Sequence, residues 1–236
     1  MKIKYYLIIF VIALSTRLSY LASRWKMLPD WHVDALGYQQ LALNLLTRGV
    51  FSMSMHPPYR PDIIRTPGYP IFIVTIYALF GVIPKAVLVI QAAIDSFTAL
   101  IVMNLSLEIS DSKESALIAG ILYAFSQSAW RYSAEFYVET LLAFLIAFAF
   151  YVASKMRKGR QGLMLKSLLL GIVVGSSILV KPSVILLPLV LGGVLLARAL
   201  WKEVIIHCNT DSDSFSLDNP QCFSLWSSHI VNGVLK

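Results

Sequence analysis

The sequence predicts an all-α integral membrane protein with about six transmembrane helices and a long first outer loop that contains amphipathic or re-entrant helices. Of its 236 residues, 57% are hydrophobic and only 14% are charged, whereas a soluble domain carries about 25% charged residues. The apolar residues form successive runs near the roughly 20 residues that a helix needs to cross a bilayer. The net charge of +7 lies in short clusters between these runs, which indicates contact with a lipid bilayer and argues against a nucleic-acid partner.

Six apolar runs are the predicted spans, and together they form one membrane domain over residues 1–202. Because further spans follow the first run, an uncleaved first span is favoured over a signal peptide. After residue 202 the hydrophobicity falls and no period is visible, so residues 203–236 are predicted to be a disordered or atypical tail. The predicted spans are residues 5–23, 86–107, 116–131, 138–154, 162–180 and 183–200.

The first outer loop, residues 24–85, is rich in charges and prolines. Residues 34–46 have helical spacing and predict an interfacial amphipathic helix, capped by Asp34 or just after it. Residues 67–83 are apolar but contain three helix breakers near their start. This second segment is predicted to be a re-entrant or interfacial helix.

The distribution of lysine and arginine predicts the orientation. Cytoplasmic loops favour these residues, so the N-terminus and the loop 155–161 are expected on the cytoplasmic side of the plasma (inner) membrane. An even number of spans must then separate them. The spans 5–23, 86–107, 116–131 and 138–154 satisfy this requirement, and counting 67–83 as a fifth span would break it.

The candidate chemistry lies in the outer loops. Asp34 begins the amphipathic helix, and Glu135 and Glu139 stand at the outer mouth of the fourth span. A carboxylate there acts as a general base, or it binds a divalent metal such as Mg²⁺ or Mn²⁺ that neutralises a phosphate leaving group. Asp34 and Glu139 are the candidates for either role, and a plain helix cap is the alternative for Asp34.

Basic residues near the same face are candidate phosphate contacts. Arg60 and Arg65 flank a proline-rich turn, and a guanidinium binds phosphate oxygens well; snorkelling beside an interfacial helix is the alternative. Lys181, in the turn between the last two spans, either adds another cation or belongs to an ordinary turn.

Two opposite charges lie inside predicted spans. At a rise of about 1.5 Å per residue, Arg17 lies about 9 Å and Asp95 about 13 Å from the outer ends of their helices. Charges at such depth are costly and are usually paired. We therefore expect a structural ion pair between Arg17 and Asp95, with a proton relay as the alternative.

Several short motifs, in this order and spacing, resemble the C-type membrane glycosyltransferases, in the branch of protein O-mannosyltransferases and aminoarabinose transferases that use polyprenyl-phosphate sugars. The resemblance covers roughly residues 5–200. The motifs are Asp34-x-x-x-Tyr38-x-x-Leu41-Ala42-x-Asn44-Leu45-Leu46 with Gly49-Val50-Phe51-Ser52, Arg65-Thr66-Pro67-Gly68-Tyr69-Pro70, Leu79-Phe80-Gly81, Tyr132-Ser133, Val138-Glu139-Thr140-Leu141 and Lys181-Pro182-Ser183.

The resemblance implies an inverting transfer of a sugar from a polyprenyl-phosphate-linked donor to a lipid, glycan or protein acceptor at the outer membrane face. It gives Asp34 the role of base or metal contact and Glu139 that of the second acid. It makes Arg65, with Arg60 beside it, the contact for the donor phosphate. The chain is then expected to be the N-terminal part of such an enzyme.

Two other classes stay open at this point. A transporter or channel subunit would have inverted repeats, broken helices at mid-membrane and a polar pathway, whereas the sequence has no visible repeat and gathers its charges in the outer loops. The second alternative is an inactive truncated fragment, which the atypical tail suggests.

Overall fold

The computed structural model describes residues 1–27, 29, 32–156 and 162–197. The chain forms two compact units, Met1–Ile185 and Leu186–Lys236. All of the long helices lie in the first unit, and the second is described only as far as Ala197, where the apolar helix Pro182–Ala197 ends. The predicted tail, residues 203–236, falls outside the described residues.

The described part is all-helical, which confirms the predicted fold class. It contains no strand, and one isolated antiparallel bridge joins Ser52 and Pro61. The elements are α1 (Ile3–Ser23), α2 (Val33–Arg48), α3 (Gly68–Phe80), α4 (Pro84–Ser110), α5 (Lys113–Ala124), α6 (Gln127–Ser133), α7 (Val138–Met156), α8 (Leu163–Val180) and the short 3₁₀ helix η1 (Pro182–Val184).

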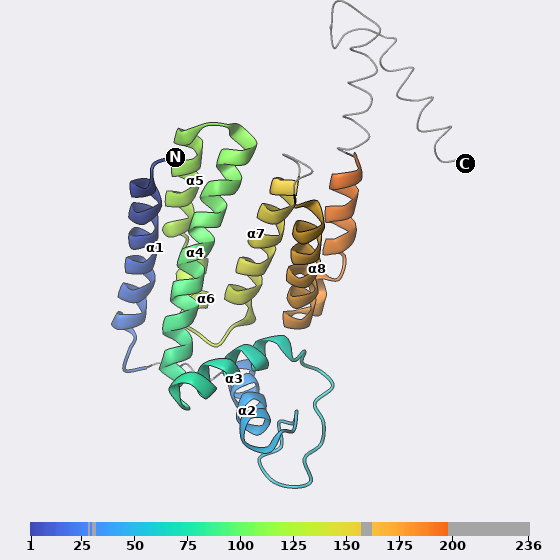
Figure 1. The fold of residues 1–236 in the computed structure, drawn as a ribbon. Helices are drawn as coiled ribbons and strands as arrows, with labels where there is room; N and C mark the ends of the chain where they lie inside the picture. Colours follow the sequence, from blue (N-terminus) through green and yellow to red (C-terminus); the bar gives the residue numbers. More distant parts are fainter. Residues whose placement is uncertain (28, 30–31, 157–161, 198–236) are drawn as a thin grey trace, which may run out of the picture. The chain divides into compact units, whose positions relative to one another are not determined.

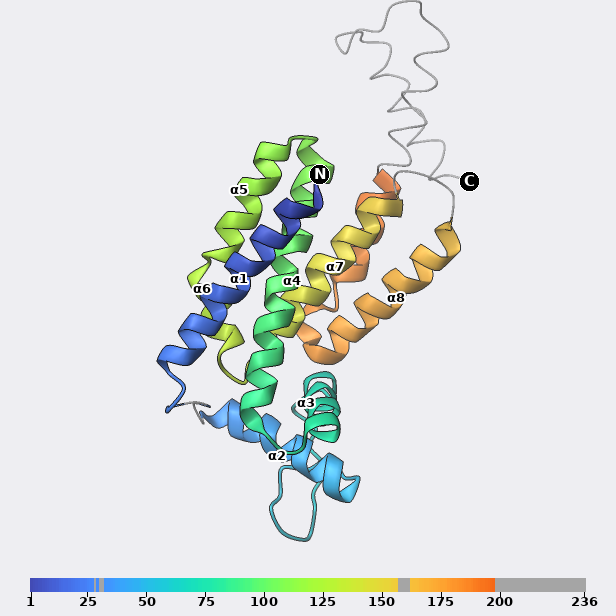
Figure 2. The same ribbon diagram turned by 60° about the vertical axis from the view of Figure 1, so that its left-hand side comes forward.

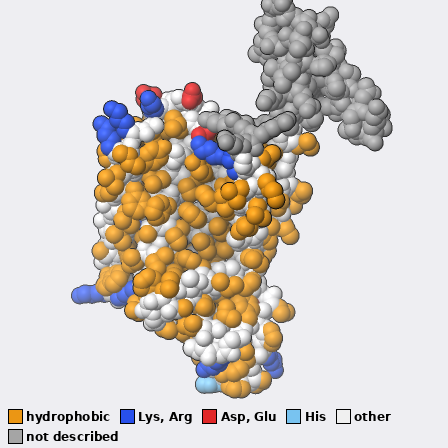
Figure 3. All heavy atoms as spheres, in the orientation of Figure 1, with side chains coloured by type: hydrophobic (Ala, Val, Ile, Leu, Met, Phe, Trp, Pro, Cys, Tyr) orange, Lys and Arg blue, Asp and Glu red, His pale blue; other side chains and the backbone are white. Residues whose placement is uncertain are grey.

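Four helices are long and apolar enough to cross a membrane: α1, α4, α7 and α8. Helix α4 packs on α1, α5 and α7, and α7 packs on α8. Hydrophobic side chains cover the visible flank of this bundle, and charged side chains gather toward its two ends (Figure 3). A flank of this kind suits lipid tails, because they accept apolar side chains without the cost of hydrating them. The protein is therefore a multi-pass membrane protein.

The predicted third span, residues 116–131, is divided into two helices. Ser112 caps the start of α5, since its Oγ accepts a hydrogen bond from the backbone N–H of Ser115. Helix α5 ends at Ala124, and α6 begins at Gln127 after a break at Phe125 and Ser126. Such a break leaves backbone carbonyl groups without helical partners, and inside a membrane protein another group must bind them.

Helices α2 and α3 pack on each other, and they lie across one end of the long helices (Figures 1 and 2). The predicted amphipathic helix is thus present as α2, but its cap differs from the expectation. His32 is the N-cap, and its ring accepts the backbone N–H of Ala35, while Asp34 lies in the first turn. The C-cap of the helix is Gly49, whose φ of 68° is in the left-handed region that glycine adopts readily.

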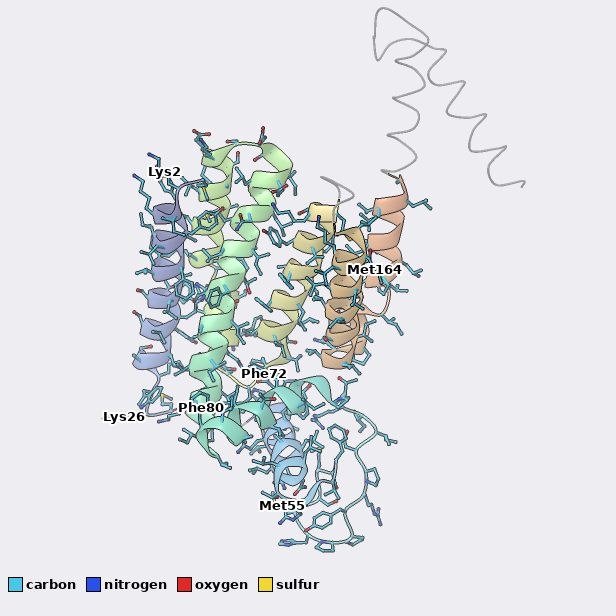
Figure 4. The ribbon with its side chains drawn as sticks, viewed as in Figure 1. Lys2, Lys26, Met55, Phe72, Phe80 and Met164 are labelled. Carbon is cyan, nitrogen blue, oxygen red and sulfur yellow. The ribbon has the colours of Figure 1, made fainter. Side chains whose placement is uncertain are left out.

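The two ends of the bundle differ in composition. Lys26 and Met55 lie at the end that carries α2 and α3, here called the α2–α3 end, whereas Lys2 and Met164 lie at the opposite end (Figure 4). The start of α1 and the end of α7 share the opposite end, as the predicted even number of spans requires (Figure 1). Which end faces the cytoplasm stays a prediction.

Candidate functional site

Arg65 and Asp34 form an ion pair at the α2–α3 end. The Arg65 Nη2 lies 2.8 Å from Asp34 Oδ1. The Arg65 side chain is only 14% exposed, whereas that of Asp34 is 62% exposed. The guanidinium is therefore held inside the site, and the carboxylate stays open to an incoming molecule.

A tight turn directs Arg65 toward α2. The Oδ1 of Asp62 accepts the backbone N–H groups of Ile64, at 3.0 Å, and of Arg65, at 2.7 Å. The other carboxylate oxygen of Asp62 lies 4.0 Å from Arg65 Nη1. Aspartate often stabilises turns through such bonds to its own following backbone. Asp62 thus fixes both the backbone and the charge of Arg65.

A glycine in α2 makes room for the guanidinium. A Cβ atom placed on Gly37 would lie 2.8 Å from Arg65 Cζ, closer than real Cβ contacts allow. The Arg65 Cζ also lies 5.5 Å from the centre of the Tyr38 ring, where a cation is attracted to the aromatic face. Helix α2 therefore presents three adjacent features to Arg65, namely the small Gly37, the ring of Tyr38 and the carboxylate of Asp34.

A second ion pair joins α7 to the end of α8. Glu139 lies in the first turn of α7, where a negative charge is favoured by the helix dipole. Its Oε1 lies 2.8 Å from Nζ of Lys181, the C-cap of α8. Its Oε2 is buried and has no hydrogen-bond partner in the described part of the chain. One oxygen of this carboxylate thus has no donor among the described residues.

Contacts between the loop and α8 bring both pairs to the same end of the bundle. The hydroxyl of Thr66 donates to the carbonyl of Val180, at 3.0 Å. A Cβ atom placed on Gly68 would lie 2.6 Å from the backbone of Leu179, so the start of α3 approaches α8 as closely as only glycine permits. The residues next to Arg65 therefore touch the residues next to Lys181.

Tyr38 experiences the charges of both pairs. Burial is the largest cause that raises the pKa of its hydroxyl, and the negative charge of Asp34 raises it further. Arg65 lowers this pKa, and Glu139 and Asp62 raise it. Because these effects fall off with distance, they show that the two carboxylates share one electrostatic environment around Tyr38.

A buried polar network holds the aromatic ring on which Tyr38 packs. The ring of Tyr38 contacts that of Tyr69 edge to face, with 4.9 Å between centroids. The Tyr69 hydroxyl donates to Gln91 Oε1 at 2.6 Å, and Gln91 Nε2 donates to the backbone carbonyl of Glu135 at 2.9 Å. The buried carboxylate of Glu135 pairs with Arg24 at 3.2 Å. Buried polar groups of this kind are costly unless they are paired, and the satisfied ones here fix Tyr69 against α4.

Residues 60–210, more than half of the chain, match the sequence model of the dolichyl-phosphate-mannose-protein mannosyltransferases. The chain belongs to this family. It is accordingly a mannosyltransferase-type glycosyltransferase. Searches of curated proteins and of solved structures each found no match to the chain.

The family match includes Arg60, Arg65, Glu139 and Lys181, while Asp34 lies before its first residue. Of the residues singled out in the sequence, the structure joins Arg65 to Asp34 and Lys181 to Glu139. Arg60 is exposed, and its backbone carbonyl accepts a hydrogen bond from the hydroxyl of Ser52 at 2.6 Å. Within the described ranges no ion pair involves its guanidinium.

Three residues of this candidate site were not recognised from the sequence: Gly37, Asp62 and Met53, whose sulfur lies 2.9 Å from Arg65 Nη1. A glycine inside a predicted helix is itself a signal of close packing, so Gly37 was detectable in principle. The other two are brought to Arg65 only by the folding of the loop.

The metal alternative finds no donor set in the described residues. No group of three or more His, Cys, Asp and Glu side chains gathers there. Asp34 and Glu139 each already bind a cation of the protein itself. These residues therefore do not fit a metal ion without further ligands, and no step proposed below uses one.

The pair inside the membrane is more extensive than the sequence suggests. Arg17 Nε lies 2.7 Å from Asp95 Oδ2, and both side chains are buried. Arg17 Nη1 also donates to the carbonyl of Ala124 at 2.6 Å, and Nη2 to that of Tyr123 at 3.2 Å. The Tyr123 hydroxyl donates to Asp95 Oδ1 at 2.8 Å. Arg17 therefore binds the carbonyl groups at the end of α5, where the broken span needs a donor.

Proposed function

We propose that the α2–α3 end transfers a sugar, mannose by family, from a polyprenyl-phosphate donor to an acceptor hydroxyl at the outer face of the plasma membrane. The observation that carries the proposal is the Arg65–Asp34 pair, in which a mostly buried cation holds a mostly exposed carboxylate. A cation and a base side by side are what the transfer of a sugar from a phosphate requires.

The donor phosphate is assigned to the cations. Arg65 presents a fork of N–H donors that matches phosphate oxygens, and Lys181 and Arg60 add positive charge. As the bond between C1 of the sugar and the phosphate oxygen breaks, its electron pair leaves with the phosphate. Fixed positive groups stabilise this developing charge, and such stabilisation is usually the largest single contribution to catalysis.

The acceptor is assigned to the carboxylates. The acceptor oxygen forms the new bond to C1 from the face opposite the phosphate, and its proton passes to Asp34. Glu139, with its unpartnered Oε2, assists by accepting a hydrogen bond from the sugar or the acceptor. A general base of this kind typically contributes a factor of about 10² to 10⁴ in rate.

The pairing in the structure also implies competition for Arg65. A bound phosphate and the Asp34 carboxylate are both anions, and both favour the same guanidinium. Donor binding therefore weakens the Arg65–Asp34 contact and releases the carboxylate for its role as base. The substrate itself would thus prepare the base.

The decisive experiment replaces Asp34 by Asn in the full chain, reconstituted in lipid vesicles with a labelled polyprenyl-phosphate mannose and an acceptor hydroxyl. We expect kcat to fall by about 10² or more because the base is lost, while KM for the donor falls because its anionic competitor is gone. Asp111→Asn is the matched control, since Asp111 lies at the end of α4 with a φ of 52°, which Asn accepts readily. Unchanged turnover in Asp34→Asn would remove Asp34 from the reaction.

A further inference from the structure

Two isoleucines next to the site are almost fully exposed. Ile63 is 93% and Ile64 is 84% exposed, and both precede Arg65 directly. Single exposed apolar residues are common, whereas adjacent large ones held outward in a fixed turn suggest a partner. We propose that Ile63 and Ile64 insert into the bilayer and thereby hold Arg65 at the level of the lipid phosphates.

The turn that exposes them is fixed rather than loose. Asp62 accepts the backbone N–H groups of Ile64 and Arg65, and the backbone N–H of Asp62 donates to the carbonyl of Phe51 at 2.9 Å. The carboxylate of Asp62 thus stabilises a turn whose two apolar side chains, Ile63 and Ile64, are exposed. The same turn directs Arg65 inward, to Asp34.

The position of the turn fits a bilayer better than another partner. Thr66 donates to the carbonyl of Val180 at the end of the membrane-spanning helix α8. Leu179, beside it, is 52% exposed. The isoleucines therefore lie close to the end of α8. The apolar surface of this helix faces lipid and ends at this level.

The far end of α3 has the same character. Leu79 is 72% and Phe80 is 57% exposed, and α3 lies across the ends of the long helices (Figure 1). Exposed apolar side chains thus occur both before and at the end of this helix. A segment that lies along a bilayer surface places its apolar residues below the head groups and its cations among them. The turn before α3 has this composition, with Ile63 and Ile64 beside Arg65.

Site-directed fluorescence tests this inference without any measurement of activity. Ile63→Cys and Ile64→Cys, each in a chain with Cys208→Ser and Cys222→Ser, are labelled with an environment-sensitive dye and reconstituted in phosphatidylcholine and phosphatidylglycerol vesicles without donor lipid. Met55→Cys is the matched control, because Met55 is 67% exposed and lies on the loop far from the spans (Figure 4).

We expect blue-shifted emission at positions 63 and 64, together with strong quenching by lipids that carry a nitroxide near the head group, and neither effect at position 55. Emission at 63 and 64 equal to that at 55 would overturn the inference. Shielding that occurs only after addition of a polyprenyl phosphate would also overturn it, because the donor lipid and not the bilayer would then cover the pair. Neither outcome depends on whether Asp34 is the base.

Discussion

The cluster around Arg17 allows a prediction whose magnitude follows from the contacts. Replacing Arg17 by Met removes the partner of Asp95 inside the bundle, and leaving one charge of a buried pair unpaired costs about 3–5 kcal/mol. The substitution also removes the bonds to the carbonyls of Ala124 and Tyr123. Each carbonyl keeps one other donor, the hydroxyl of Thr16 and the backbone N–H of Ser126 respectively.

The lost carbonyl bonds therefore add about 1 kcal/mol each rather than the full cost of an unsatisfied group. The free energy of unfolding should fall by about 5–7 kcal/mol in Arg17→Met, as the sum of these terms. Asp95→Asn should cost about 3 kcal/mol, near the low end for a broken pair, because Arg17 keeps its carbonyl acceptors and the amide oxygen still accepts from Arg17 or Tyr123.

The assay is reversible unfolding of the purified chain in mixed detergent micelles, with Lys113→Met as a control at an exposed cation that should shift stability by about 0.5 kcal/mol or less. The double variant Arg17→Met/Asp95→Leu removes both charges and should be more stable than Arg17→Met alone, because no uncompensated charge remains. A cost for Asp95→Asn that equals or exceeds that of Arg17→Met would refute the reasoning, since the carbonyl contacts would then carry no weight.

Three further predictions concern the α2–α3 end. Gly37→Ala should raise KM for the donor, because its Cβ displaces the Arg65 guanidinium, while Gly171→Ala, in open space on α8, is the matched control and should leave the steady-state kinetics unchanged. Gly68→Ala should lower thermal stability in detergent by forcing α3 away from Leu179; equal melting temperatures would contradict the close approach. The double change of residues 63 and 64 to Ser should raise KM for the lipid donor more than it lowers kcat; an effect on kcat alone would argue against a role in holding Arg65 at the membrane surface.

The helices themselves were predictable because their signals are local. The hydrophobic runs gave α1, α4, α7 and α8, and the spacing of residues 34–46 gave α2. The even number of spans argued against counting residues 67–83 as a span, and the helix there, α3, is only 13 residues long. The cap of α2 was wrong because Asp is the commoner capping residue, whereas the ring nitrogen of His32 fills this position.

The pairings within the site were not predictable from the sequence. Arg65 and Asp34 are 31 residues apart, and Lys181 and Glu139 are 42 apart. Their partners are decided by how α2 packs on α3 and how the loop meets α8, and no local pattern encodes either. The contacts of Arg17 with α5 were missed for a related reason: the break after Ala124 leaves the carbonyls of Tyr123 and Ala124 accessible to Arg17, and the sequence 116–131 shows no proline or glycine at that point.

The two charged clusters of this chain differ in what they do with their charges. At Arg17 both partners are buried, every strong donor has an acceptor, and no oxygen of Asp95 is left for a substrate, so the cluster holds α1, α4 and α5 together. At Arg65 the cation is buried but Asp34 is 62% exposed, and Glu139 keeps an oxygen with no partner in the described residues. A partly exposed pair of this kind contributes little to stability, and the carboxylate of Asp34 is open to a substrate. The incomplete satisfaction of the α2–α3 end is therefore the feature that favours catalysis there and not at the pair within the membrane.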